Sequence, residues 1–176
     1  MEIDKVSNLR NEKFMSVEKG QSGFYRWWFK EDAAFVLIKK MQKWLPDKNK
    51  FLLRDIYGKT YVALYFGISK DMRGRIKWHA CQKHTPSTVS NGFLSTLRQT
   101  LSALQDEHMS VSYDIVNKFI DENCILEWDY SDNPHKVELE ELSQEHYYYP
   151  LNVKDNKTIC KEAIDWWIQE RAKYRN

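Results

Sequence analysis

The chain has 176 residues, of which 42% are hydrophobic and seven are tryptophans, so it fits one compact domain and excludes a disordered chain. Its 27 Lys and Arg nearly balance its 25 Asp and Glu, so bulk charge does not indicate a nucleic-acid partner. The longest apolar run, residues 33–38, is too short for a membrane span, and the three scattered cysteines form no CxxC pair; we therefore expect a cytoplasmic protein with reduced thiols and no membrane segment.

The first part of the chain predicts a polar arm, a strand, a helix and a pair of strands. Aromatic residues bounded by glycine favour a strand, and apolar residues at helical spacing before Pro46 favour a helix. The turn at residues 57–59 separates the paired strands. The expected ranges are 1–20 for the arm, 22–29 for the strand, 31–45 for the helix, and 51–56 and 60–68 for the paired strands.

The rest of the chain predicts mainly helices, with Ser69 or Asp71 as a candidate N-cap for the first and Asn91 for the second. Because strands and helices mix without strict alternation, we expect an α+β fold. The folded domain would span residues 21–176, with a helical insertion at about 30–50. The expected elements are a helix through 73–79, a polar loop at 81–90, helices at 93–105 and 111–122, a strand at 125–130, an acidic helix at 134–146 and a closing amphipathic helix at 158–174.

Four short pieces stand out where the expected strands end and helices begin. They are Gly23-Phe24-Tyr25, then Tyr65-Phe66-Gly67, then Arg75 with His79 at ten and fourteen residues beyond Tyr65, and finally the acidic helix before Pro150-Leu151-Asn152. Each piece alone indicates only strand aromatics or a charged surface. In this order they resemble the signature of the GIY-YIG nuclease family over roughly residues 22–152, and residues 84–104 resemble a bacterial subgroup of it.

The resemblance implies a small central antiparallel sheet flanked by helices and a metal-dependent endonuclease acting on DNA. Tyr25, Tyr65, Arg75 and His79 match the catalytic positions, and a late glutamate would hold one Mg²⁺ or Mn²⁺ that stabilises the leaving group. We expect Tyr25 and Tyr65 on neighbouring strands with their hydroxyls facing one cleft. A tyrosine would activate water, which needs a cation nearby because its pKa is ordinarily about 10. Arginine offers a planar fork matched to phosphate oxygens.

Local charge supports a phosphate-facing surface after the second motif. Five Lys or Arg lie between residues 70 and 83 against one acid, Asp71. From this segment, Lys70, Arg73 and Lys77 are the candidate contacts to the DNA backbone.

Three tests for the metal-binding glutamate disagree. The apolar neighbours of Glu138 fit the family pattern, the distance to Pro150 favours Glu141, and the distance to Asn152 favours Glu140. A single carboxylate with a substrate phosphate is a normal way to hold Mg²⁺. We favour Glu141 and then Glu138 as the metal ligand, and expect Asn152 to order the chain after the helix.

The pattern departs from the family between the two motifs, where 39 residues (26–64) separate Tyr25 from Tyr65. We interpret the extra helix as a packing insertion; the alternative is a helix that contacts DNA or a partner. Two alternatives to an endonuclease are open. The chain could be a nucleic-acid-binding module that has lost catalysis, or an interaction domain whose tryptophans 27, 28, 166 and 167 form a protein interface. A homodimer or a separate DNA-targeting partner fits an endonuclease without its own DNA-reading domain.

Overall fold

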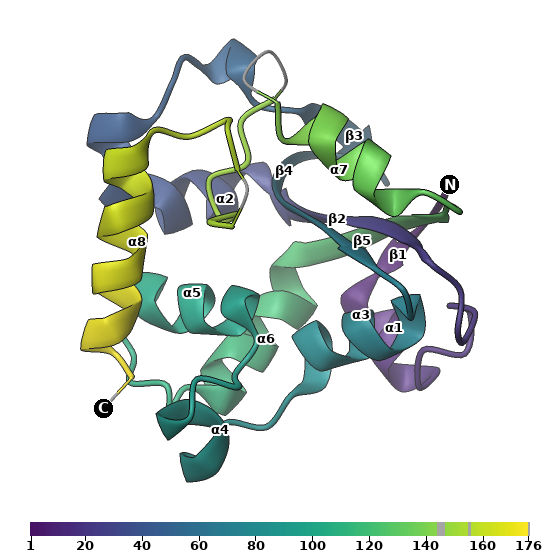
Figure 1. The fold of residues 1–176 in the computed structure, drawn as a ribbon, viewed down its shortest axis with the longest axis horizontal. Helices are drawn as coiled ribbons and strands as arrows, with labels where there is room; N and C mark the ends of the chain where they lie inside the picture. The colour runs from purple at the N-terminus through teal and green to yellow at the C-terminus, as the bar shows by residue number, and fades with distance from the viewer. Residues whose placement is uncertain (144–146, 155, 176) are drawn as a thin grey trace.

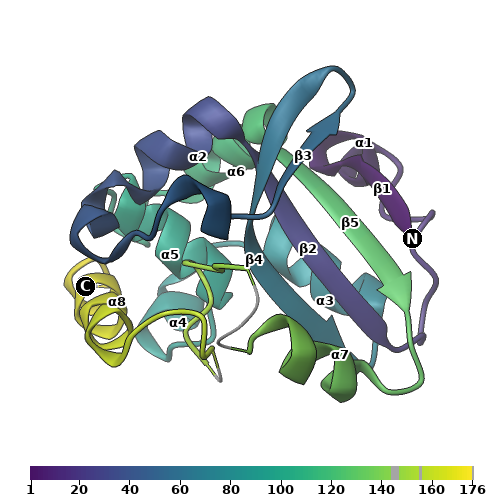
Figure 2. The same ribbon diagram turned by 90° about the horizontal axis from the view of Figure 1, so that it is seen from above.

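The computed structural model describes residues 1–143, 147–154 and 156–175. One antiparallel sheet forms the centre of the molecule, and its strand order is β1-β5-β2-β4-β3 (Figure 2). This architecture confirms the expected α+β class with a central antiparallel sheet flanked by helices. The strands are β1 (Glu2–Lys5), β2 (Gly23–Lys30), β3 (Leu53–Ile56), β4 (Lys59–Ser69) and β5 (Cys124–Tyr130).

Helices cover both faces of the sheet. Figure 1 shows α7 on one face and α1, α3, α5 and α6 on the other, with α8 beside α5. The helices are α1 (Val6–Asn11), α2 (Glu31–Leu37), α3 (Met72–Cys81), α4 (Pro86–Ser90), α5 (Thr96–Leu104), α6 (Tyr113–Asn123), α7 (Pro134–Glu141) and α8 (Lys161–Lys173), with short 3₁₀ helices η1 (Ile38–Trp44) and η2 (Lys48–Lys50). Within the described ranges, the helices are all too short or too polar to span a bilayer.

The central strand β2 is buried on both faces, because side chains alternate along a strand and each face carries its own layer of helices. Trp27 is 0% exposed and packs in the larger core, whereas Trp28 is 2% exposed and packs under α7. Trp167 is also fully buried. The hypothesis that Trp27 or Trp28 forms an exposed interface is therefore wrong, since the sheet gains a second covered face from α7.

A bulge interrupts β4 next to Tyr65. Trp27 pairs with Tyr65 and Trp28 pairs with Ala63, so Leu64 is an extra residue in the ladder. Without an extra residue, Leu64 and Tyr65 would point to opposite faces; with it, both contact the larger core. From Tyr25 to Trp27 the ladder is regular, with Tyr25 opposite Gly67 and Trp27 opposite Tyr65, so ordinary strand alternation places Tyr65 on the same face of the sheet as Tyr25.

The outer edge of β4 beyond Val62 is not paired with β3. The amide of Asn152 covers part of it, because its Oδ1 accepts from the Phe66 N–H (2.8 Å) and its Nδ2 donates to the Phe66 carbonyl (2.6 Å). Leu151 N–H donates to the Leu64 carbonyl at 3.1 Å. Asn152 therefore orders the chain after α7 against this strand, as expected from the sequence.

Residues 1–20 differ from the expected polar arm. Strand β1 pairs antiparallel with β5, and α1 follows it directly. Val6, Leu9, Phe14 and Val17 are essentially fully buried. The segment closes the far edge of the sheet because these four apolar side chains reach the core between polar neighbours.

The insertion between the motifs is a packing element, in agreement with our interpretation. The expected helix 31–45 is α for its first half and 3₁₀ for its second, and its buried side chains join the main core. Trp44 packs against Trp166 of α8 with ring centroids 5.3 Å apart, and the Trp44 carbonyl accepts from Tyr148 at 3.0 Å. The insertion therefore supports α8 and the chain after α7.

Three other boundaries differ from the expectation. The expected loop at 81–90 contains α4, and the expected helix from residue 93 begins only at Thr96, after the N-cap Ser95. The acidic helix expected at 134–146 ends at Glu141, and residues 144–146 lie outside the described residues.

Candidate active site

One pocket of about 410 Å³ collects residues from β2, β4, α3, α5, α7, the chain after α7, and α8. It lies where the open end of β4 faces α7 on one side and α5 and α8 on the other. Its charged or hydroxyl-bearing lining residues are Tyr25, Tyr65, Arg75, Thr96, His135, Glu138, Lys154 and Arg171. Sequence reasoning had named four of them: Tyr25, Tyr65, Arg75 and Glu138.

The two motif tyrosines converge on this pocket, as expected from the sequence. They lie on the neighbouring strands β2 and β4, and their ring centroids are 6.4 Å apart. The side chains of Tyr25 and of Thr96, at the start of α5, both lie close enough to Tyr65 to influence its pKa. The two phenols therefore lie side by side in the pocket wall.

Gly67 gives Tyr25 the space for this position. A Cβ on Gly67 would lie 2.4 Å from the Tyr25 hydroxyl oxygen and 2.5 Å from its Cζ. The Tyr25 side chain thus lies directly across the backbone of its β4 partner. Glycine is required at residue 67 for close approach, not for an unusual backbone angle.

His79 lies behind Tyr25 instead of lining the pocket. Its Nε2 is 2.8 Å from the Tyr25 hydroxyl and its Nδ1 is 2.6 Å from Ser95 Oγ, and the ring is 1% exposed. Burial, followed by the charges of Arg75 and Arg98, lowers the pKa of His79 to about 3, so the ring is neutral at physiological pH. Its geometry is that of a residue that positions Tyr25.

The fully buried Arg98 fixes the end of α3 that carries His79. Its guanidinium donates to the carbonyls of His79 (3.2 Å) and Ala80 (2.9 Å), to Asn117 (2.8 Å) and to His84 (2.8 Å). Four acceptors compensate for the burial of this cation. The link from Arg98 to His79 to Tyr25 explains how the helix after the second motif controls a tyrosine of the first.

The surroundings distinguish the two tyrosines. Burial raises the pKa of both phenols, and a negative charge on Tyr65 would raise the pKa of Tyr25 further. The Thr96 side chain and the charges of Arg75 and Arg171 lower the pKa of Tyr65. Tyr65 is therefore the phenol of the pair that loses its proton first.

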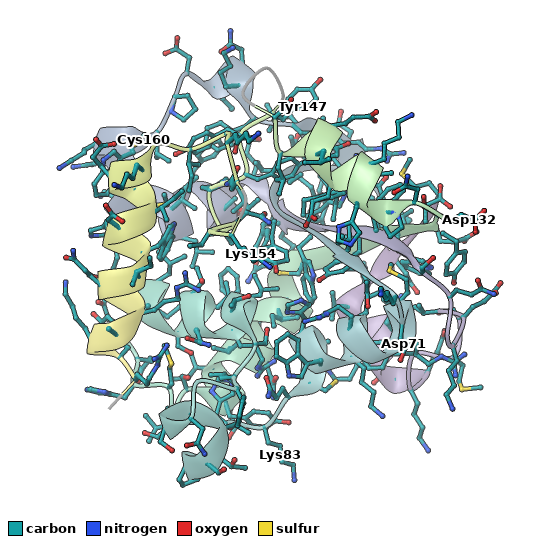
Figure 3. The ribbon with its side chains drawn as sticks, viewed as in Figure 1. Asp71, Lys83, Asp132, Tyr147, Lys154 and Cys160 are labelled. Carbon is teal, nitrogen blue, oxygen red and sulfur yellow. The ribbon has the colours of Figure 1, made fainter. Side chains whose placement is uncertain are left out.

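Arg75 lies at the mouth of the pocket on α3. The helix begins there because the Asp71 side chain accepts from the Gly74 N–H, which caps its first turn. The Arg75 guanidinium stacks over the Trp78 ring at 4.8 Å, which holds it in place while leaving it exposed. Arg75 also lines an adjacent groove of about 740 Å³, whose rim includes Asp71 and Asp132 (Figure 3).

The glutamates of α7 face different ways. Glu138 lines the pocket, with an oxygen 3.6 Å from Nδ1 of His135 one turn earlier. Glu141 instead packs under the helix, where it pairs with Arg26 and accepts from the Tyr149 hydroxyl at 2.8 Å. Glu140 is exposed and outside the pocket lining. Of the candidates weighed from the sequence, Glu138 is the one that the fold brings to the tyrosines.

The network around Glu141 attaches α7 to the sheet. Arg26 bridges Glu141 and Glu127 (3.0 Å to the latter), and Glu127 also accepts from Arg54 at 2.7 Å and from the Trp28 indole at 3.1 Å. Each carboxylate thus has charged partners on the α7 face of the sheet. The network holds the helix that presents Glu138.

The three basic residues expected to contact DNA have different surroundings in the structure. Lys70 lines the groove beside the pocket. Arg73 donates to the Val17 carbonyl at 2.5 Å and the Met15 carbonyl at 3.3 Å, so it fastens the N-terminal segment. Lys77 is exposed on α3 but lines neither the pocket nor the groove.

Four lining residues were not found from the sequence: Thr96, His135, Lys154 and Arg171. His135 had a usable signal, since it precedes Glu138 by one helical turn. Lys154, labelled in Figure 3, follows α7 in the chain, and Arg171 comes from α8. Helical periodicity identified α8 but gave no reason to assign one of its cations to a site.

The residues present fit one divalent cation held partly by substrate. Among the described residues, no three His, Cys, Asp or Glu side chains cluster to form a metal site. Mg²⁺ commonly uses one or two carboxylates, several waters and a substrate phosphate. Glu138 beside a pocket lined by cations supplies that donor set with an incoming phosphate.

A family model described as GIY-YIG catalytic domain matches residues 23–173. The match covers both tyrosine motifs, α3, α7 and α8. The chain therefore belongs to the GIY-YIG family, a family of nucleases. Searches of curated proteins and of solved structures found no match.

Proposed function

We propose that this protein is a metal-dependent endonuclease that hydrolyses phosphodiester bonds in DNA. The observation that carries the proposal is the convergence of Tyr25, Tyr65, Arg75 and Glu138, from four separate elements, on one pocket within a GIY-YIG domain. Catalysis by a tyrosine pair, a phosphate-binding arginine and a metal-binding carboxylate requires such a meeting point.

In this mechanism Tyr65 is the general base. Its phenolate oxygen takes a proton from a water molecule, the oxygen of that water attacks phosphorus, and the bond from phosphorus to the leaving oxygen breaks. Tyr25 donates its hydroxyl hydrogen to Tyr65 and accepts from Nε2 of His79, while Nδ1 of His79 accepts from Ser95. These bonds orient Tyr25 and favour negative charge on Tyr65.

Arg75 binds the phosphate under attack. The guanidinium at the mouth of the pocket meets the charge that grows on the phosphate oxygens, and its two parallel N–H groups match them. Glu138 would hold Mg²⁺ or Mn²⁺, and the ion would stabilise the leaving oxygen. Lys70 lies beside the pocket where the flanking DNA backbone would pass.

The test is a plasmid-nicking assay with the purified protein. Cleavage is expected with Mg²⁺ or Mn²⁺, none with EDTA, and none from a folded Glu138→Gln variant. Cleavage in EDTA would contradict the metal dependence. Metal-independent DNA binding without any cleavage would instead support a module that has lost catalysis.

A further inference from the structure

Arg171 has the environment of a binding residue and not of a packing residue. It lies in the third turn of α8, is 8% exposed, and lines the pocket with Tyr65 and Arg75. Burial lowers the pKa of Arg171 to about 10, which leaves the guanidinium charged at neutral pH. A buried cation needs compensation from its surroundings.

Arg98 provides the comparison within the same molecule. Both arginines are buried, and burial lowers the pKa of each to about 10. Arg98 donates to four different residues. The hydrogen bond shown for Arg171 runs from Nε to the Trp167 carbonyl of its own helix, at 3.3 Å. Across residues 1–143, 147–154 and 156–175, no carboxylate forms an ion pair with it. Arg171 thus lines the pocket without the set of acceptors that the guanidinium of Arg98 has among the described residues.

The charge of the pocket identifies the missing partner. Arg75 and Arg171 bring two guanidinium cations to the lining, whereas Glu138 is the carboxylate among the described lining residues. Arg75 and Arg171 both lower the pKa of Tyr65, so both positive charges act on the same phenol. A pocket with this balance favours an anion whose oxygens accept several N–H donors.

We propose that Arg171 is a second substrate-binding residue, which takes phosphate oxygens of the nucleic-acid strand inside the pocket. Arg75 contacts the strand at the mouth, where the pocket meets the neighbouring groove, and Arg171 contacts it from the inner wall. The inference deepens the proposed function and rests on it for the identity of the ligand. It gives α8, the closing helix, a part in substrate binding.

The experiment measures binding without cleavage. A fluorescein-labelled DNA oligonucleotide is titrated in EDTA with the parent, Arg171→Met and Lys173→Gln at several salt concentrations. Lys173 is a matched control, since it lies on the same helix outside the pocket and pairs with Glu170. Arg171→Met is expected to weaken binding about tenfold at low salt and to reduce the salt slope by about one phosphate contact. Lys173→Gln is expected to leave both close to the parent.

A second measurement separates binding from packing. Thermal unfolding is followed with and without inorganic phosphate. Without phosphate, Arg171→Met is expected to unfold at the parental temperature or above it, because methionine removes an uncompensated buried charge. With phosphate, the parent should be stabilised and Arg171→Met should not. If Arg171→Met does not fold, Arg171→Lys replaces it, with a smaller phosphate-dependent stabilisation than the parent as the expected result.

Two outcomes distinguish this inference from the proposed function. If the parent cleaves DNA but Arg171→Met binds with the parental affinity and salt slope, the inference is overturned and the nuclease stands. If the parent never cleaves but DNA and phosphate binding depend on Arg171, the inference stands and the nuclease is lost. A variant that is less stable without phosphate and responds to phosphate like the parent would make Arg171 a packing residue.

Discussion

Replacing Gly67 by alanine should separate the tyrosine pair from its support. The new Cβ would lie 2.4 Å from the Tyr25 hydroxyl oxygen. An ordinary contact is about 3.5 Å, so the ring must move by about 1 Å. Its hydroxyl is now 2.8 Å from His79, and a shift of that size breaks the hydrogen bond. The ring has little room, since it packs against Tyr65 on one side and His79 on the other.

The expected cost follows from those distances. Overpacking a buried site costs about 1–3 kcal/mol, and losing the hydrogen bond adds about 0.5–1.5 kcal/mol. For a chain of this size, each kcal/mol lowers the unfolding temperature by about 2–4 °C. A displacement of about 1 Å in a catalytic group typically lowers the rate about 100-fold. Gly67→Ala should therefore lose far more activity than its remaining folded fraction explains.

The assay compares cleavage rate and unfolding temperature for Gly67→Ala and Gly58→Ala. Gly58, in the turn between β3 and β4, has a φ of +72° and no neighbour within 4 Å of an added Cβ. Alanine there strains the backbone but does not touch the site, so stability should fall while cleavage by the folded protein is retained. Parental cleavage by Gly67→Ala would refute the reasoning that Tyr25 must be held in one position.

Three further predictions concern the remaining site residues. Glu138→Gln should weaken Mn²⁺ binding in calorimetric titration with little change in unfolding temperature. Glu141→Gln should instead cost about 1–3 kcal/mol of stability, because it removes one of the two carboxylates that Arg26 bridges; the reverse pattern would make Glu141 the metal ligand. Arg75→Ala should lower the cleavage rate about 100- to 1,000-fold, and Arg75→Lys should recover little of it. DNA affinity should fall much less than the rate. Equal losses in rate and affinity would show that Arg75 only binds phosphate in the ground state. His79 has a pKa of about 3 in the folded protein and about 6.5 in the unfolded chain, so its contribution to stability is present above pH 6.5 and falls by about 1.4 kcal/mol per pH unit down to about pH 3. Urea unfolding across that range should show a shallower pH dependence of stability for His79→Gln than for the parent. Identical slopes would contradict a neutral buried ring.

The sequence predicted the fold class and the order of most elements, because strand and helix periodicities are strong where one face is buried. It failed on residues 1–20, where the buried side chains of Val6, Leu9, Phe14 and Val17 stand among polar residues without a clear period. It also failed on Trp28, because nothing local shows that α7 covers the second face of the sheet.

The site was predictable where residues lie close to a motif and unpredictable where the fold brings them together. Tyr25, Tyr65 and Arg75 follow from spacing. The choice between Glu138 and Glu141 depends on which side of α7 meets Arg26, which is a contact made across 115 residues of sequence. Arg171 has no local signal, since its role depends on the packing of α8 beside the pocket.

The amide of Asn152 also affects what the edge of β4 offers to other chains. A bare strand edge offers unpaired N–H and C=O groups to any other chain in extended conformation, and such edges are common starting points for aggregation. Here a single side chain occupies both groups of Phe66, so the edge is blocked without a further strand that would fill the neighbouring pocket. The pocket can thus stay open beside a sheet edge whose Phe66 groups are no longer available to another extended chain.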